Sequence, residues 1–198
     1  MDNDTNRTYT AFAGHRMLAT GPLRETLRRT KEQIDRGGSD PILIFEDQSG
    51  QQVDFDFRGT LDEVWEREAP VPQHIGPGRP RLGVVSREVS LLPRHWEWLE
   101  GQPNGASAAL RRLVEEARKR SPGEDRARLA TNSASKFMWA MTGDFPGFEE
   151  ASRALFARNR ERFEELIRDW PGDIRAHLQR LVEPCFAGAG APAPLTPR

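Results

Sequence analysis

Residues 86–119 read SREVSLLPRHWEWLEGQPNGASAALRRLVEEARK, and this stretch decides how the chain is interpreted. The residues before Pro93 are rich in β-branched and aliphatic side chains, and proline is favoured in the first turn of a helix. A break rich in Gly, Pro and Asn follows. Apolar residues then recur at helical spacing from Leu110 to Ala117. We therefore expect a strand over residues 82–92 followed by two helices.

This strand-helix-helix pattern resembles the ribbon-helix-helix DNA-binding domain. In that family two chains pair their strands into an antiparallel ribbon that enters the major groove, and the second helix holds a DNA phosphate at its N-terminus. Gly105 and Ser107 stand at the corresponding place here, where free N–H groups and the helix dipole favour an anion. The resemblance implies a homodimer, with residues 84–92 at the two-fold axis, that binds double-stranded DNA.

Two alternatives exist for the face of the strand that meets DNA. A register counted back from Pro93 in the family's manner points the odd-numbered residues toward DNA, and Arg87 among them could contact guanine O6 and N7. Hydrophobic alternation instead points the even-numbered polar residues outward. These are Ser86, Glu88 and Ser90. A unit that packs or dimerises without touching DNA is a further alternative.

A proline-rich and glycine-rich segment, residues 69–81, precedes the strand and is typical of a linker. Its end, PGRPR at 77–81, resembles the core of an AT-hook, which lies in a narrow minor groove where an inserted arginine is attracted. Residues 76–136 also carry 12 basic and 7 acidic side chains. A plain linker is the alternative. The candidate DNA-binding residues are therefore Arg79, Arg81, Ser86, Arg87, Ser90, Gly105, Ser107 and Arg111.

The rest of the chain indicates an α+β protein. A small N-terminal module is expected to contain two extended pieces around a Gly14–His15 turn, a helix from Pro22 to about Asp35, a hairpin over residues 42–57 and a short helix. A helical bundle is expected at the C-terminal end. The expected divisions are a module at 1–68, the linker at 69–81, the strand-helix-helix unit at 82–120, a loop at 121–130, a helical region at 131–187 and a disordered tail at 188–198.

Few residues suggest catalysis. Asp54 and Asp56 share one face of the expected hairpin, with Glu46 and Asp47 across its turn, so a carboxylate cluster for Mg²⁺ or acid–base chemistry is one reading and a solvated face is the other. The four histidines lack paired metal-ligand spacing, and no nucleophile elbow or phosphate loop occurs. We expect no catalytic residue, no cofactor and no metal, and an enzyme is the third hypothesis for function.

Composition narrows the class of protein. The 198 residues include 29 Lys and Arg, 30 Asp and Glu, and one cysteine, Cys185. No apolar run approaches the ~20 residues of a membrane helix, and the N-terminus lacks the features of a signal peptide. These observations predict a cytoplasmic protein with no membrane partner. Trp96 and Trp98 lie roughly 200° apart around a helix, so one of them must be exposed or meet a partner.

Three sequence blocks, TAFAGHR at 10–16, LLPRHWEWL at 91–99 and GFEEASRALF at 147–156, resemble a bacterial family of uncharacterised proteins. That resemblance implies no activity and no catalytic residues. The leading hypothesis is a dimeric DNA-binding protein such as a transcriptional regulator. The alternative is a protein–protein interaction module that binds no DNA.

Overall fold

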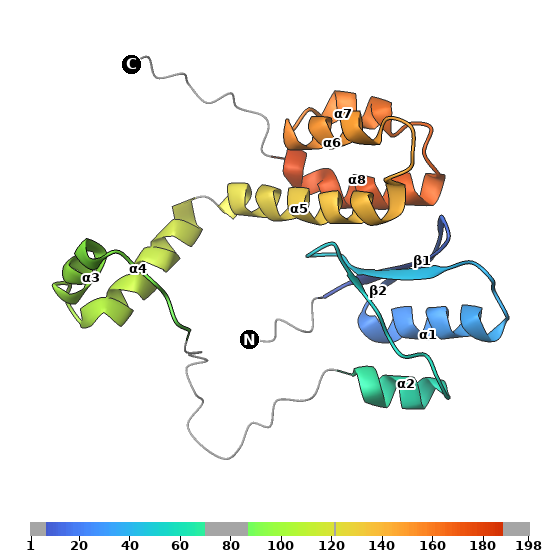
Figure 1. Cartoon of the computed structure of the whole chain (residues 1–198), viewed down its shortest axis with the longest axis horizontal. Coiled ribbons are helices and arrows are strands. Elements are labelled where there is room, and N and C mark those ends of the chain that lie inside the picture. The colour runs from blue at the N-terminus through green and yellow to red at the C-terminus, as the bar shows by residue number, and fades with distance from the viewer. Residues whose placement is uncertain (1–6, 70–86, 121, 188–198) are drawn as a thin grey trace. The chain divides into compact units, whose positions relative to one another are not determined.

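The structure, a computed structural model, describes residues 7–69, 87–120 and 122–187 (Figure 1). The chain divides into two compact units. Unit 1 combines residues 1–70 with residues 123–198, and unit 2, residues 71–122, is inserted between these two segments. The N-terminal module and the C-terminal helices, expected as separate regions, therefore share one unit.

A four-stranded antiparallel sheet forms the centre of unit 1, in the order β2-β1-β3-β4. Its strands are β1 (Tyr9–Ala13), β2 (Arg16–Gly21), β3 (Ile42–Glu46) and β4 (Gln51–Val53). Residues 14 and 15 form the predicted turn, with Gly14 at a φ of +53°. The expected strand alternation from Val53 to Phe57 is wrong beyond Val53. Phe55 there packs its ring against Tyr9, with ring centroids 6.2 Å apart, instead of extending the strand.

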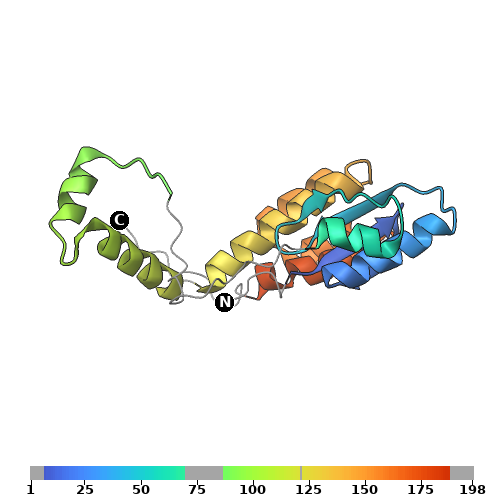
Figure 2. The same cartoon turned by 90° about the horizontal axis from the view of Figure 1, so that it is seen from below.

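One face of the sheet is covered by α1 (Leu23–Asp35), which in turn contacts α2 (Leu61–Glu68) (Figure 2). Helix α1 matches the helix predicted from Pro22 to about Asp35, and α2 is the expected short helix. Pro22 precedes α1, and Thr60 caps α2 in a capping box with Glu63. Leu27 of α1 and Val64 of α2 are buried.

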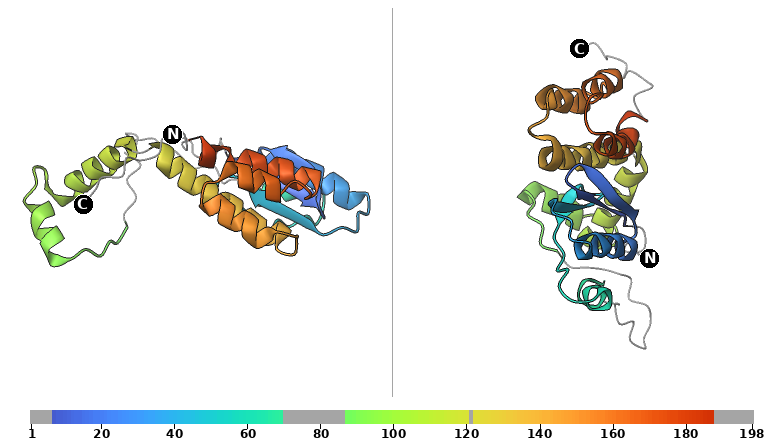
Figure 3. Two further views of the ribbon diagram at one scale, coloured as in Figure 1. Left: turned by 90° about the horizontal axis from the view of Figure 1, so that it is seen from above. Right: turned by 90° about the vertical axis from the view of Figure 1, so that its right-hand side faces the viewer.

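The opposite face of the sheet is covered by the C-terminal helices (Figure 3). These are α5 (Pro122–Thr142), α6 (Phe148–Phe156), α7 (Arg160–Leu166) and α8 (Gly172–Phe186). The ring of Phe137 on α5 lies 5.5 Å from that of Phe12 and 4.9 Å from that of Phe45. His177 on α8 contacts Phe137 at 4.5 Å. The strands supply one half of this core and the C-terminal helices the other, which is why neither forms a unit alone.

The loop expected at residues 121–130 is wrong, because α5 begins at Pro122. Proline suits the first helical position, and Glu124 and Asp125 in the first turn favour the positive end of the helix dipole. Ala127 is already buried one turn later. The charges that suggested a loop therefore belong to the start of a helix of 21 residues.

Unit 2 contains the two predicted helices, α3 (Pro93–Glu100) and α4 (Gly105–Arg120). Residues 87–92 form no strand, so the described part of the expected strand over 82–92 is not a strand in the single chain. The rest of that expected strand lies outside the described residues. So do the linker from residue 70 onward and the expected tail. The α+β class is confirmed. Within the parts of the chain that are described, no helix combines the length and apolar character needed to cross a bilayer.

Candidate functional site

The candidate DNA-binding residues of unit 2 fall at two places. Arg87 and Ser90 are exposed in the segment before α3. Gly105 starts α4 with a φ of +77°, so Ser107 lies inside the first turn of the helix. Arg111 donates to the Ser107 carbonyl (3.2 Å) and to its hydroxyl (3.4 Å), which places these two side chains together. Arg79, Arg81 and Ser86 lie outside the described residues.

The carboxylates of the expected hairpin do not form a cluster. Asp56 accepts hydrogen bonds from Arg58, and Arg67 lies 3.8 Å away. These cations, above all Arg58, hold the pKa of Asp56 well below its usual range. The residues that the structure describes contain no group of three or more metal-binding side chains. Asp56 is therefore an ion-pair partner at the surface, and Asp47 points into a different environment.

Unit 2 leaves large apolar side chains exposed. Leu99 and Ala109 are its buried residues among those described. Trp96 is half-buried and Trp98 is 52% exposed, as their spacing predicted. The remaining large exposed apolar side chains of the unit are Val89, Leu92, Leu113 and Val114. Exposed apolar groups concentrated in one small unit are typical of an interaction surface.

The second half of α4 is exposed on all sides. Every residue from 111 to 119 is exposed, including Leu113 and Val114 in the middle of the helix. Exposed ion pairs join Arg112 to Glu116 at 4.0 Å and Arg118 to Glu115 at 3.2 Å. Such pairs contribute little to helix stability. A helix of this kind usually owes its stability to a partner that covers its apolar stripe.

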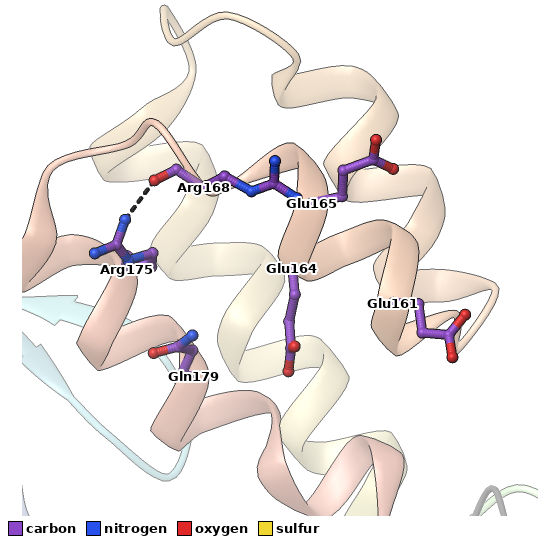
Figure 4. A pocket seen from close by; sticks show the side chains of 6 residues that line it. All are labelled: Glu161, Glu164, Glu165, Arg168, Arg175 and Gln179. Atoms are coloured by element: carbon purple, nitrogen blue, oxygen red, sulfur yellow. Dashed lines mark hydrogen bonds between the residues drawn. The ribbon is translucent and has the colours of Figure 1, made fainter.

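In unit 1, a hollow of about 600 Å³ lies between α7 and α8 (Figure 4). Its lining residues are Glu161, Glu164, Glu165, Arg168, Arg175 and Gln179. Two of its glutamates are already paired with cations, Glu164 with Arg160 and Glu165 with Arg162. Figure 4 shows the lining side chains spread along the two helices and the turn between them, with Arg175 donating to the carbonyl of Arg168. The groove thus presents separate surface groups that do not converge on one point.

A second hollow of unit 1, of about 430 Å³, brings together polar groups from distant parts of the chain. We call it the Asp47–Arg180 cavity. The β-strands contribute its first wall, with Thr20 and Gly21 at the end of β2 and Asp47 just after β3. Helix α8 contributes the other. The remaining lining residues are Thr8, His177, Arg180 and Leu181.

Threonines hold Asp47 in place. The hydroxyl of Thr10 donates to Asp47 Oδ1 at 2.8 Å and lies 2.9 Å from the hydroxyl of Thr20. Because the Thr10 proton goes to the carboxylate, Thr20 is the donor to Thr10. Burial raises the pKa of Asp47 above its ordinary value, an effect opposed by its hydrogen bonds to threonines and by the charge of Arg180. The cavity therefore holds a carboxyl group whose pKa lies above its ordinary value.

His177 lies beside this carboxyl group and is 1% exposed. Its Nδ1 is 2.9 Å from Nη2 of Arg180. A guanidinium can only donate, so Nδ1 accepts and the imidazole proton resides on Nε2. Burial, and secondarily Arg180, lowers the pKa of His177 to about 3, which keeps the ring neutral. The Nε2–H group has no hydrogen-bond partner, and it lies 3.9 Å from Asp47 Oδ1.

Sequence reasoning missed this cavity. The sequence groups Asp47 only with its neighbours in the hairpin, and His177 has no second histidine at a metal-ligand spacing. The two residues are far apart in the chain and carry no shared motif. Thr10 stands in the block TAFAGHR, but its spacing of two residues from Phe12 predicts only that both lie on one face of a strand.

Comparison with known proteins gives one match. A family model described as "Uncharacterized protein conserved in bacteria (DUF2239)" matches residues 8–182. This range includes the whole of unit 2 and every residue that lines the Asp47–Arg180 cavity. No curated protein and no solved structure matches the chain.

Proposed function

The chain belongs to this family of uncharacterized proteins conserved in bacteria, as its sequence blocks predicted, and we propose that it functions as a self-assembling protein whose two copies are joined through α4. The observation that carries the proposal is the exposed second half of α4. Of the hypotheses drawn from the sequence, this favours the protein–protein interaction module, with a second copy of the chain as the partner.

The apolar residues of α4 are arranged so that two antiparallel copies of the helix can cover each other's apolar stripe. A two-fold axis between Leu113 and Val114 places each of these residues opposite the other in the second copy. The same axis places Leu110 opposite Ala117, so the whole apolar stripe faces its own copy. Covering a Leu or Val side chain of this kind is worth about 1.5–3 kcal/mol.

The charges that flank the stripe obey the same symmetry. With the axis between Leu113 and Val114, the basic pair 111–112 of one copy lies at the level of the acidic pair 115–116 of the other. A parallel arrangement would instead set like charges at the same level, which is destabilising. Charge complementarity therefore selects a second copy in antiparallel orientation. The ion pair from Arg112 to Glu116 within one helix is exposed and costs little to exchange.

Size-exclusion chromatography with light scattering tests the proposal on the full chain at micromolar concentration. The wild type is expected to be a dimer at both low and high salt, because apolar burial is the main contribution. Val114→Lys is expected to give a monomer. The circular dichroism of the full chain should still show the helical signal of a folded protein. Leu129→Lys is the matched control, since Leu129 is an equally exposed residue on α5. A monomeric wild type would refute the proposal.

A charge exchange tests the orientation. At positions 111, 112, 115 and 116, a variant with Arg111→Glu and Arg112→Glu carries only acids, and a variant with Glu115→Arg and Glu116→Arg carries only bases. Each is expected to be monomeric alone, and an equimolar mixture is expected to form a heterodimer. Homodimers in both single preparations would show that these charges do not select the antiparallel orientation.

DNA binding is the second candidate function. It is supported by the pairing of Ser107 with Arg111 at the N-terminal end of α4, where backbone N–H groups favour phosphate. No carboxylate lies within ion-pair distance of Arg111 among the described residues. A dimer would present two such ends. The single cysteine, which is buried, supports the further proposal of a cytoplasmic location.

A further inference from the structure

The Asp47–Arg180 cavity contains two side chains whose charges lack a direct partner. Within the part of the chain that is described, no Lys or Arg lies within ion-pair distance of Asp47, and its near neighbour His177 is neutral. Arg180 donates to the neutral His177 and approaches Met17 Sδ at 4.0 Å, with no carboxylate within ion-pair distance in that same part. One negative and one positive group thus line the same hollow without pairing closely.

Burial makes this arrangement costly when the cavity holds only water. Asp47 is held in place by Thr10 on the core side, where it loses solvent, and desolvation disfavours its charge. The buried Nε2–H of His177 is a further unsatisfied donor next to the same carboxylate.

The dimensions and walls of the cavity suit a small organic molecule. Its volume of about 430 Å³ lies in the range of ligand pockets. Leu181 contributes an apolar wall, and the Thr8 and Thr20 hydroxyls contribute neutral hydrogen-bonding groups. Arg180 is exposed on α8, so its guanidinium can be reached from solvent. A carboxylate can accept two parallel hydrogen bonds from the planar guanidinium of Arg180.

We propose that this cavity binds a zwitterion of the α-amino acid class, with the ligand's ammonium group at Asp47 and its carboxylate at Arg180. A simple anion would satisfy Arg180 but would be repelled by Asp47. A simple amine would satisfy Asp47 and leave Arg180 unpaired. The zwitterion satisfies both charges at once, and Leu181 is placed to contact its side chain.

Differential scanning fluorimetry and isothermal titration calorimetry on the full chain test this proposal, with the twenty common free L-amino acids as probes at up to millimolar concentration. At least one is expected to raise the melting temperature and to show saturable binding. Its analogue without the amino group and its analogue without the carboxyl group are each expected to bind at least tenfold more weakly, about 1.4 kcal/mol for one lost charged contact.

Variants assign the binding to the cavity. Asp47→Asn, which keeps the shape that accepts from Thr10, and Arg180→Gln are each expected to weaken binding about tenfold or more while leaving the melting temperature of the free protein within a few degrees. Arg175→Gln, a charge change on α8 outside the cavity, is the matched control and is expected to bind as the wild type does. The proposal is overturned if no amino acid binds, if either truncated analogue binds as tightly, or if the cavity variants bind like the control. The dimer test is independent, since the cavity lies in unit 1.

Discussion

Gly50 and Ser133 touch backbone to backbone. A β-carbon on Gly50 would lie 2.6 Å from both the carbonyl carbon and the α-carbon of Ser133. Gly50 also has a φ of +65°, a conformation that favours glycine. From the other side, the Ser133 hydroxyl donates to the carbonyl of Asp47 at 2.7 Å. The turn between β3 and β4 is thus fixed to α5, and this contact positions the Asp47 side chain.

Gly50→Ala is expected to destabilise the protein by roughly 2–4 kcal/mol, because the new methyl group meets helix backbone that cannot move aside cheaply. Chemical denaturation followed by circular dichroism measures the free energy of unfolding. Gly37→Ala is the control, since Gly37 has a φ of +78° but open space around it. It should show only the conformational cost of about 1–2 kcal/mol. Equal losses in both variants would mean that the contact with Ser133 is unimportant.

Phe137→Ala is expected to cost about 3–5 kcal/mol, because Phe137 is fully buried between Phe12, Phe45 and His177. Both the sheet and the C-terminal helices should lose protection from hydrogen exchange together. Phe156→Ala removes the same side chain from a position that is 58% exposed and should change stability by less than about 0.5 kcal/mol. Loss of protection in the helices alone would contradict a shared core.

His177 should make stability fall in mild acid. Its pKa is about 3 in the folded chain and 6.5 in the reference state, so between these values the unfolded chain binds a proton that the folded chain does not. The contribution is fully present above pH 6.5 and decreases by up to about 1.4 kcal/mol per pH unit below it. Asp47 acts in the opposite direction, since its raised folded pKa favours proton uptake by the folded state.

Urea unfolding at pH 7 and pH 5 measures this dependence. The wild type is expected to lose about 2 kcal/mol from His177, less the opposing contribution of Asp47. His177→Gln should flatten the curve between these pH values, whereas His15→Gln, at an exposed turn position, should not. An unchanged slope in His177→Gln would show that another group causes the dependence.

If the protein binds DNA, two substitutions are expected to weaken the binding in different ways. Arg87→Ala should cost about 1–3 kcal/mol at a specific site and flatten sequence preference, because it would read a base. Arg81→Ala, outside the described residues, should weaken all sequences alike and reduce the salt slope by about one unit. Fluorescence anisotropy on a pool of genomic fragments at two salt concentrations separates these outcomes. Wild-type binding no stronger than that of a charge-matched control protein would exclude the DNA hypothesis.

The Glu88→Gln variant is a separate test of the DNA-binding hypothesis. Two such carboxylates near a DNA groove would oppose binding, so Glu88→Gln should strengthen it and keep its selectivity if the segment before α3 faces DNA. Unchanged binding would assign that segment a structural role and leave dimer formation as the function of unit 2.

Local signals predicted the elements better than their assembly. Gly14 and Pro22 mark a turn and a helix start through backbone chemistry that acts within a few residues. The sequence did not predict the start of α5, because charged residues such as those of its first turn are found both in loops and at helix N-termini. The pairing of Asp47 with His177 had no local signal at all, since only the packing of α8 on the sheet brings them together.

A ribosome making this chain completes the four strands long before it makes the C-terminal helices that cover one face of the sheet. β4 ends at Val53, whereas the imidazole that packs on Phe12 belongs to residue 177. At 5–20 residues per second, the roughly 125 intervening residues take about 6–25 s to synthesise. Until Phe137 of α5 is made, the Phe12 and Phe45 face of the nascent sheet is open to chaperones and to neighbouring nascent chains. The inserted unit 2 lengthens this delay, because residues 71–122 separate the two halves of the core in the sequence.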